Sequence, residues 1–552
     1  MSKKVILLLS IVVVVINATS LTNEVFTSDS ALYASIAKSF SASGNYLDII
    51  VLERDWLDKP HFPYWLCALS INIFGANAFA YKLPSILLFL VSLFYTFKLA
   101  EKIYNKETGY LAAIILGSSL HIIISNNDVR AEAILMGLIM GAIYHMYKLT
   151  QRFSFADLVL TSLFSGTAIM TKGLFILIII YSAIFGNMIL KGQFKEMLKF
   201  RWIFVLLLTF VFIFPELYAV YTQFDLHPEK VVFGRTGVSG LKFFVWDSQF
   251  GRFFNTGPIK GSGDPFFFFH TMLWAYAPWV FIGFTALFIY VKELFKRKKD
   301  QDYLTLLGFS IMFVIFSASK FQLPHYLNII YPFISILTAS VLLQKGNKNP
   351  IKKITNISLN LYAVVYILMI ALLEYFFRTD YPVIGITLCI VLTGVIIFFN
   401  VTKKYGEGKP IIFAVLGVAI FAIFLNFSFY PSLFKYQSGV FMADFANENY
   451  PKEPIIVTHN EGLMEYYSEN KLIHLDSLGS VDEAIQKIST FNKVLLYTDK
   501  ELMDEFTEKG LKYNIIQEYE HYHITTLTKE FIFYKTRPEE LKTRYLMEVW
   551  VE

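Results

Sequence analysis

The chain has 552 residues, of which 55% are hydrophobic and only 17% are charged, and its mean hydropathy is +0.50. An average soluble domain carries about a quarter charged residues, so this composition excludes an ordinary water-soluble protein. The net charge of +5 is small and lies mainly at the ends of apolar runs, which excludes a nucleic-acid-binding surface as its explanation.

Apolar segments along the chain predict about thirteen membrane-spanning helices, because a helix needs about 20 apolar residues to cross the hydrocarbon core. The first segment follows Lys3 and Lys4 and resembles a signal peptide as well as an uncleaved helix. We favour the uncleaved helix because the topology described next requires it. The segments, several of them short, are 5–20, 80–99, 109–125, 131–148, 157–171, 173–190, 202–221, 266–291, 303–319, 324–343, 357–377, 381–400 and 411–430.

Basic residues predict the orientation of these spans, because cytoplasmic loops of membrane proteins are enriched in Lys and Arg. With the N-terminus in the cytoplasm every second loop is cytoplasmic, and the intervening loops are mostly poor in basic residues. The pattern fits an odd number of spans and places the C-terminal segment on the periplasmic side. The basic residues of the cytoplasmic loops are Lys102, Lys106, Lys148, Arg152, Lys191, Lys195, Lys199, Arg201, Lys292, Lys296, Arg297, Lys298, Lys299, Lys345, Lys348, Lys352, Lys353, Lys403, Lys404 and Lys409.

The membrane domain predicted in this way covers residues 1–430 and has two long extracytoplasmic loops, 21–79 and 222–265. In the first loop, apolar residues recur every fourth position between 30 and 40, which predicts a helix lying on the membrane surface. The apolar run 62–74 is too short to span and is expected to be interfacial. The second loop is rich in glycine, which suits a mobile cover over a site and equally a flexible connector.

After residue 430 the pattern changes to that of a small α/β domain, residues 431–552. Short β-rich runs begin at positions 454, 472, 493 and 531 and alternate with helical patterns that begin at 481 and 500. This segment has no glycine-rich phosphate loop and no metal-ligand cluster in its sequence, so the sequence assigns it no chemistry.

Ionisable residues near the bilayer are informative, because each is costly there and needs a reason. Plainer interpretations exist: Asp29 and Asp128 fit helix caps, and Arg130 and Glu132 fit an ion pair with each other. All of these residues nevertheless fall on one side of the membrane in the predicted topology. They gather at five places, which are Asp29; Asp58 with Lys59; Asp128 with Arg130 and Glu132; Asp247 with Arg252; and Lys320 with Tyr326.

These residues fall within five of seven short segments that follow one another in a fixed order over residues 20–335. Each segment is only moderately specific, but seven in register are hard to attribute to chance. They are 28-SDSALYASIAKSF, 57-LDKPHFPYW, 79-FAYKLPS, 126-NNDVRAEAIL, 171-TKG, 243-FFVWDSQFGRF followed by 278-PW, and 319-SKFQLPHYLNIIYP.

This arrangement resembles the bacterial polyprenyl-phosphate-sugar transferases typified by the lipid A aminoarabinose transferase, which are relatives of the protein O-mannosyltransferases. The resemblance implies a polytopic α-helical membrane protein of the GT-C type with a C-terminal α/β domain. It implies an inverting transfer of a sugar from polyprenyl (undecaprenyl) phosphate to a lipid A, glycan or protein acceptor at the periplasmic face of a bacterial inner membrane. The sugar and the acceptor stay open, and no nucleic acid is expected as a partner.

The resemblance also implies roles for particular residues. A carboxylate must align or activate the acceptor, and Asp29 is the first candidate and Asp128 the second. The leaving group is a lipid phosphate, whose negative charge must be met by fixed donors and cations. The candidates for this contact are Lys59, Arg252, Lys320 and the Tyr326 hydroxyl.

This sequence departs from the family pattern near the first of these lysines. Asp58 stands where the family usually has Glu, and His61 stands where it usually has a second Pro. Ser248 replaces the usual His after the acidic residue, which is Asp247 here. Some members of the family bind a metal ion near these positions, so Asp58 and Asp247 are candidate ligands of a divalent ion. The substitutions at Asp58, His61 and Ser248 argue against such a site here.

Two other classes of function are compatible with a polytopic membrane protein. A membrane transporter or flippase of lipid or sugar substrates would carry its charged groups near the bilayer midplane and show a repeat between its halves, and neither feature is evident in the sequence. A non-enzymatic assembly or sensor protein would use the C-terminal domain to bind partners.

Overall fold

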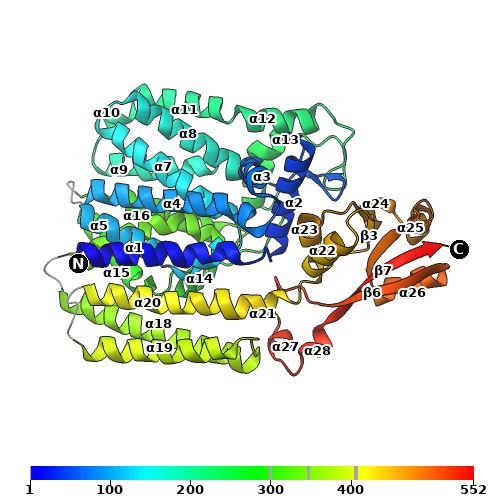
Figure 1. Ribbon diagram of the computed structural model, residues 1–552. Helices are drawn as coiled ribbons and strands as arrows, with labels where there is room; N and C mark the ends of the chain where they lie inside the picture. Colours follow the sequence, from blue (N-terminus) through cyan, green and yellow to red (C-terminus); the bar gives the residue numbers. More distant parts are fainter. Residues whose placement is uncertain (1, 297–300, 345–347, 403–407, 460, 552) are drawn as a thin grey trace.

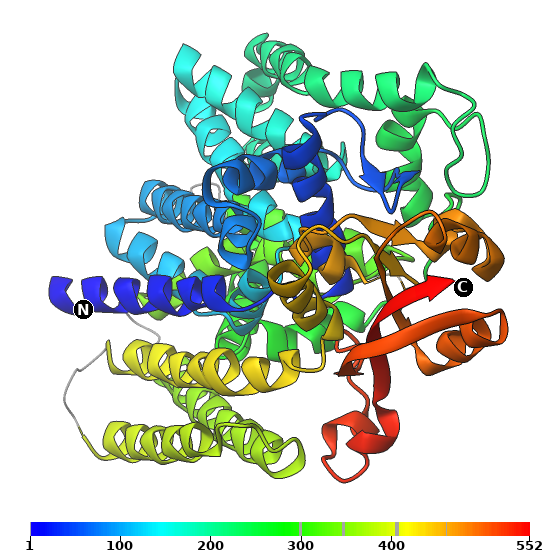
Figure 2. The ribbon, with the colours of Figure 1, turned by 45° about the vertical axis from the view of Figure 1, so that its right-hand side comes forward.

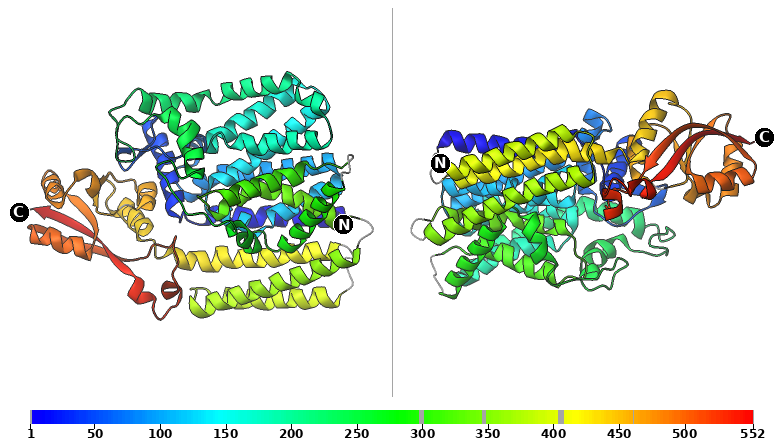
Figure 3. Two further views of the ribbon diagram at one scale, coloured as in Figure 1. Left: turned by 180° about the vertical axis from the view of Figure 1, so that it is seen from behind. Right: turned by 90° about the horizontal axis from the view of Figure 1, so that it is seen from below.

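The computed structural model describes residues 2–296, 301–344, 348–402, 408–459 and 461–551. Long helices run side by side in one body, and a smaller domain containing a β-sheet extends from one end of it (Figure 1; Figure 3). The N-terminus and the short helix α10 (Phe194–Met197) lie at the opposite end (Figure 1). The chain is thus a polytopic helical protein with an appended domain, as predicted.

Seven helical segments in the described residues are long and apolar enough to cross a membrane, or nine when two bent helix pairs are each counted as one span. The seven are Lys3–Thr22 (α1, Lys3–Ala18, and η1, Thr19–Thr22), Ala78–Ile103 (α4), Ala131–Gln151 (α7), Pro324–Leu342 (η4, Pro324–Ile330, and α17, Tyr331–Leu342), Pro350–Phe376 (in α18, Lys348–Phe376), Pro382–Val401 (α19) and Lys409–Phe434 (α20, Lys409–Phe424; η6, Leu425–Phe429; α21, Tyr430–Phe434).

The two bent pairs are α5 (Lys106–Gly117) with α6 (Leu120–Asn127), bent by 55°, and Phe194–Phe212 with Phe214–Asp225, bent by 42°. The second pair consists of α10, α11 (Arg201–Phe212), α12 (Phe214–Val220) and η2 (Tyr221–Asp225). At the α5–α6 break the Ser118 hydroxyl donates to Ile114 O (2.6 Å) and the Ser119 hydroxyl to Ile115 O (2.9 Å). The Ser119 N–H bonds to Leu116 O (3.2 Å) at the break, so the Ser119 hydroxyl satisfies the Ile115 carbonyl that the bend frees from the helix ladder, whereas Ile114 O also keeps the Ser118 N–H (3.0 Å).

The remaining predicted spans also coincide with helices, but these helices are shorter or less apolar than the span criterion requires. Seven to nine spans therefore meet that criterion, against the thirteen predicted. The helices in question are α8 (Phe155–Lys172), α9 (Ile176–Leu190), α14 (Phe267–Ala275) with α15 (Val280–Phe295), and α16 (Leu304–Ala318).

The segments between the helices at the domain end position the candidate site. Helix α2 (Ser28–Ser43) is capped by Thr27, whose hydroxyl accepts the Ser30 N–H (3.2 Å), and it ends at Gly44, which has φ 70°. It packs against α3 (Phe62–Phe74). The hairpin of β1 (Ile50–Val51) and β2 (Arg54–Asp55) precedes α3, and α13 (Gly240–Lys242) with η3 (Phe243–Gly251) belongs to the second long loop.

The C-terminal domain contains a mixed five-stranded sheet of order β4-β3-β5-β7-β6. Strands β4 (Leu472–His474), β3 (Ile455–Val457) and β5 (Val494–Asp499) are parallel, whereas β7 (Lys542–Val551) pairs antiparallel with β5 and β6 (Leu511–His521). The helices are α22 (Ser438–Asn449), α23 (Gly462–Tyr467), α24 (Leu475–Leu478), α25 (Val481–Ile488), α26 (Lys500–Glu508), α27 (Lys529–Ile532) and α28 (Arg537–Glu540).

One predicted strand of this domain is wrong. The run that begins at Phe531 forms no strand: Phe531 and Ile532 end α27, which the Thr528 hydroxyl caps by accepting the Phe531 N–H (3.2 Å), and the next two residues lie in a bend and a turn. The Phe531 ring is fully buried and stacks on Tyr522 with 3.7 Å between ring centroids. Burial of one aromatic anchor, and not strand pairing, therefore accounts for the apolar character of this run.

The C-terminal domain packs against α2, mainly through α23 (Figure 2). Tyr467 accepts the Val25 N–H (3.1 Å) before the helix, and Gly462 at the start of α23 packs on Ala31 within it. Further along, Lys38 donates to the Glu465 carbonyl (3.0 Å). The two ends of the sequence thus form one structural unit.

Candidate functional site

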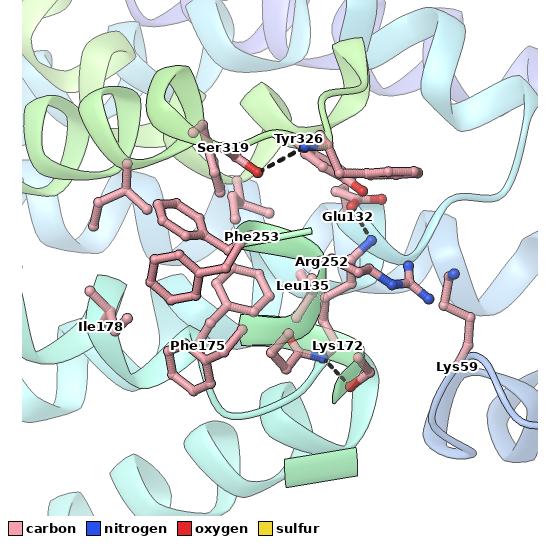
Figure 4. A pocket seen from close by; sticks show the side chains of 18 of the residues that line it. Lys59, Glu132, Leu135, Lys172, Phe175, Ile178, Arg252, Phe253, Ser319 and Tyr326 are labelled. Carbon is pink, nitrogen blue, oxygen red and sulfur yellow. Dashed lines mark hydrogen bonds and ion pairs between the residues drawn. The ribbon is translucent and has the colours of Figure 1, made fainter. Parts of the chain in front are cut away.

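A cavity of about 300 Å³ opens at the domain end of the helical body. Figure 4 shows charged and polar side chains on one side of it and aromatic and aliphatic side chains on the other. The polar side carries Asp58, Lys59, Glu132, Lys172, Ser248, Gln249, Arg252, Ser319 and Tyr326. The apolar side carries Leu135, Phe175, Ile178, Phe250, Phe253, Phe254, Ile315, Phe316, Phe321 and Ile329.

Asp58 is the centre of the first charged group. Its carboxylate forms one ion pair with Lys59 and another with Arg252, which arrives from the loop after η3. The Arg252 guanidinium also lies over the Phe321 ring, at 5.8 Å from the centroid. Burial lowers the pKa of Lys59, which Tyr326 and Asp29 offset only in part, and burial likewise lowers the pKa of Arg252.

A second charged pair lies beside the first. Lys172, the last residue of α8, donates to Glu132 in the first turn of α7 (2.6 Å). The Lys172 ammonium group is also 4.9 Å from the centroid of the Tyr326 ring, and His325 Nε2 is 3.9 Å from the second carboxylate oxygen of Glu132. The Glu132 side chain is 2% exposed, so it depends on Lys172 for its neutralisation.

The two predicted catalytic aspartates meet at Arg130, outside the cavity lining. Arg130 Nε donates to Asp128 (2.6 Å) and its Nη1 pairs with Asp29, while the Thr27 hydroxyl donates to the other oxygen of Asp128. Burial opposes the charge of Arg130, but Asp128 and Asp29 raise its pKa overall. Asp29 is about half exposed (52%), so its carboxylate remains open to a reactant.

The plainer interpretations of these residues are therefore wrong. Thr27, and not Asp29, caps α2, and Asp128 follows the C-terminus of α6 instead of capping α7. Arg130 and Glu132 do not pair with each other, because each has a nearer partner of opposite charge.

The structure brings four of the predicted site residues into one cavity: Asp58, Lys59, Arg252 and Tyr326. Lys320 is exposed and lies outside the lining, although its neighbours Ser319 and Phe321 belong to it. Asp247 is partly buried and also lies outside the lining.

The residues do not fit a divalent metal ion. Among the described residues no group of three or more His, Cys, Asp or Glu side chains is arranged to hold one. The Asp58 carboxylate is instead engaged by two cations, and Asp247 lies outside the cavity that Asp58 lines. His61 is occupied elsewhere, because its ring contacts the buried Glu216 carboxylate (3.0 Å).

Glu132 and Lys172 line the cavity but were not assigned to the site from the sequence. Glu132 is among the ionisable residues that the sequence places near the bilayer, and Lys172 lies in the segment 171-TKG. The sequence does not show that these two residues pair, because they are 40 positions apart and belong to different helices.

Comparison with known proteins supports the resemblance noted in the sequence. Residues 58–218 match the family model described as dolichyl-phosphate-mannose-protein mannosyltransferase. An uncharacterized protein of Aquifex aeolicus (strain VF5) is 28% identical over 66% of this chain and 69% of its own length. An undecaprenyl phosphate-alpha-4-amino-4-deoxy-L-arabinose arabinosyl transferase of Proteus mirabilis (strain HI4320) is 24% identical over 63% of this chain and 61% of its own length, so this chain spans less than two thirds of it.

Among solved structures, ArnT from Cupriavidus metallidurans, bound to undecaprenyl phosphate, aligns with a TM-score of 0.74. The alignment covers 99% of this chain and 98% of that one at 14% identity, which establishes a shared fold, including the C-terminal domain. The chain is thus a distant homologue of the aminoarabinose transferases, and the predicted resemblance is confirmed.

Proposed function

We propose that this distant homologue of the aminoarabinose transferases is a glycosyltransferase that takes a sugar from a polyprenyl phosphate and passes it to an acceptor at the membrane surface. The observation that carries the proposal is the cavity with two unlike sides. A lipid phosphate needs cations for its head and an apolar wall for its tail, and this cavity offers Lys59 and Arg252 beside Phe253 and Ile178.

The polar side supports a role in leaving-group stabilisation. Lys59, Lys172 and Arg252 supply three positive charges against the two carboxylates of Asp58 and Glu132. The departing polyprenyl phosphate is a monoester that acquires negative charge as the anomeric C–O bond breaks. Fixed donors in a site with little water are more effective for such a charge than the same groups in bulk water.

Asp29 is the carboxylate proposed to take the proton of the acceptor. Asp128 binds the same arginine, Arg130, that pairs with Asp29. The acceptor oxygen forms a new bond to the anomeric carbon from the face opposite the phosphate, which inverts the configuration. Its proton passes to the carboxylate, and the polyprenyl phosphate leaves with the electron pair of the broken bond. Arg130 holds Asp29 in place through its ion pair and is itself held by Asp128.

The proposal includes a membrane topology with the N-terminus in the cytoplasm, about thirteen spans, and the site and the domain of residues 431–552 in the periplasm of a bacterial cell. Its support is that α3 and α13, which lie near the cavity-lining segments at Lys59 and 248–254, are at the end of the body remote from the N-terminus (Figure 1). The short helices α8, α9 and α16 pack beside helices that meet the span criterion or beside one another, as further spans would. The basic residues Arg297, Lys298, Lys299, Lys345, Lys403 and Lys404, on which the orientation partly rests, lie outside the described residues.

The donor and acceptor are proposed by class. The relative from Proteus mirabilis is named for undecaprenyl phosphate, which supports an undecaprenyl phosphate donor here. A lipid, a glycan and a protein hydroxyl all suit the exposed Asp29 carboxylate as acceptors, with lipid A as one instance.

The test is a transfer assay with the purified full-length protein in nanodiscs, using undecaprenyl-phosphate sugars made with radiolabelled sugar and an envelope extract as acceptor. Transfer of label should require Asp29, and Asp29→Asn should reduce the rate by more than 100-fold while donor binding stays within threefold of wild type. Movement of label across sealed vesicles without cleavage of the phosphate bond would show a flippase instead and end the proposal.

A further inference from the structure

A second cavity, of about 280 Å³, lies between the C-terminal domain and the segments that precede α3. Its walls come from three parts of the chain: α2, the β1–β2 hairpin, and the segment from α23 to β4. It shares no lining residue with the candidate site. The contacts between these three parts, such as Arg54 Nη2 with the Asp476 carbonyl (2.5 Å), keep the cavity at a domain interface, where ligand sites are common.

Two polar side chains of this cavity, Lys38 and Glu465, are fixed by bonds to neighbouring residues. Lys38 Nζ donates to the backbone carbonyls of Glu465 (3.0 Å) and Ser468. Among the residues that the structure describes these are its two acceptors, so one N–H of the ammonium group remains for a ligand. The Glu465 carboxylate contacts Nε2 of the buried His474, and both residues line the cavity. Such groups lose little conformational freedom when a ligand binds.

The hairpin that forms one wall is strained at its tip. Leu52 and Glu53 have φ angles of 50° and 61°, a region that two-residue hairpin turns usually fill with Asn and Gly. A non-glycine residue in this region costs about 1 kcal/mol or more, and such residues cluster at ligand sites. The strained conformation of Leu52 and Glu53 is therefore not explained by the backbone preferences of these two residues. Their position in the cavity wall is consistent with a role in ligand binding.

The mixture of groups identifies the class of ligand. Glu53 and Glu465 offer acceptors, Lys38 offers a donor, and Ser39 offers a hydroxyl that does both. Even with a protonated His474 the lining has no excess of positive charge over Glu53 and Glu465, which disfavours an anion such as a phosphate. Sugar hydroxyls both donate and accept, and the C–H faces of a sugar suit the Ile50 and Leu472 side chains, which also line the cavity.

We infer that this cavity is a carbohydrate subsite that binds a neutral sugar unit of the acceptor, away from the unit that receives the transferred sugar. The assignment to an acceptor rests on the proposed function, whereas sugar binding does not. Helix α2 joins the two places, since Asp29 lies in its first turn and Ser39 about 15 Å further along the helix at 1.5 Å per residue. An occupant of the cavity therefore sets where the reacting end of the acceptor lies.

The experiment measures binding of free glucose, galactose, N-acetylglucosamine and their disaccharides, by saturation-transfer NMR and titration, to the full-length protein in nanodiscs. Ser39→Trp fills the cavity from an exposed position of α2, and Ala42→Trp does so from the next turn in case the first variant does not fold. Gln486→Trp, on the exposed face of α25, is the matched control. We expect at least a tenfold loss of sugar affinity in both cavity variants and no change in the control.

Three results would overturn the inference: no sugar binds to the wild type, the cavity variants bind as the wild type does, or inorganic phosphate binds in place of the sugars. Transfer of label from the donor is measured on the same samples. Donor turnover without sugar binding removes this subsite and leaves the proposed transferase intact. If both cavity variants lose sugar binding but the protein never consumes the donor, the carbohydrate subsite stands and its assignment to an acceptor is removed.

Discussion

Arg252 offers a quantitative test of the charge balance in the candidate site. The three cations and two carboxylates that line the cavity sum to +1, and Arg252→Ala brings this sum to zero. One unit charge at about 5 Å from the donor phosphate contributes about 3 kcal/mol at an effective dielectric constant of about 20. Since 1.4 kcal/mol is a factor of ten, we expect donor affinity to fall by about two orders of magnitude.

The matched control uses the partner of Arg252. In Arg252→Ala the Asp58 carboxylate loses one of its two cations and repels the phosphate. The double variant Arg252→Ala with Asp58→Asn restores the sum to +1, so it should bind donor at least tenfold better than Arg252→Ala, although it still lacks the guanidinium contacts. Binding of tritiated undecaprenyl phosphate to protein in nanodiscs measures both, with thermal melting as the folding control. A double variant that binds no better than the single one would refute this electrostatic account.

The remaining predictions concern the other charged groups. Lys59→Ala should lower donor affinity or turnover at least tenfold, measured in the transfer assay, and unchanged values of both would remove Lys59 from the site. Lys172→Met should lower the free energy of unfolding by about 3–5 kcal/mol, because it leaves the buried Glu132 carboxylate without its ion-pair partner. The double variant Lys172→Met with Glu132→Gln should recover most of this loss in an unfolding titration. Equal losses in the single and the double variant would contradict the prediction. Burial raises the pKa of Glu461 from 4.5 to about 7, against the opposing effects of Arg544 and Tyr497. Because the folded state binds this proton more tightly than the unfolded state, the contribution of Glu461 to stability is fully present below about pH 4.5 and falls by about 3 kcal/mol as the pH rises to 7. Glu461→Gln should flatten this part of the pH dependence, measured by hydrogen exchange in α23. An unchanged slope in the variant would contradict the prediction.

The sequence predicts the helices well and their partners poorly. Every apolar segment predicted to span is helical, because length and composition of a single stretch suffice for that judgement. Lys59, Arg252 and Tyr326 were assigned to one site through matched motifs, not through any local pattern that could show their proximity. The Glu132–Lys172 pair and the three-way contact of Arg130 join residues 40 and about 100 positions apart, which periodicity does not report.

The C-terminal domain shows the same limit. The parallel strands β3, β4 and β5 were predicted from β-branched and aromatic runs, whereas β6 and β7 alternate with many charged residues and were missed. The run at Phe531 satisfies strand composition, yet its placement is decided by the Tyr522 ring and the Thr528 cap. Tertiary packing of one side chain overrides local preference there.

The contacts between the C-terminal domain and the α2 region have a consequence for biosynthesis. The contacts of Val25 with Tyr467 and of Lys38 with Glu465 join residues 442 and 427 positions apart. Ribosomes add about 5–20 residues per second, so the segment bearing Asp29 waits tens of seconds for its partner to be made. A chain that stalls or is cut before α23 leaves this segment without its anchor, so completion of the polypeptide itself acts as a checkpoint on assembly of the site.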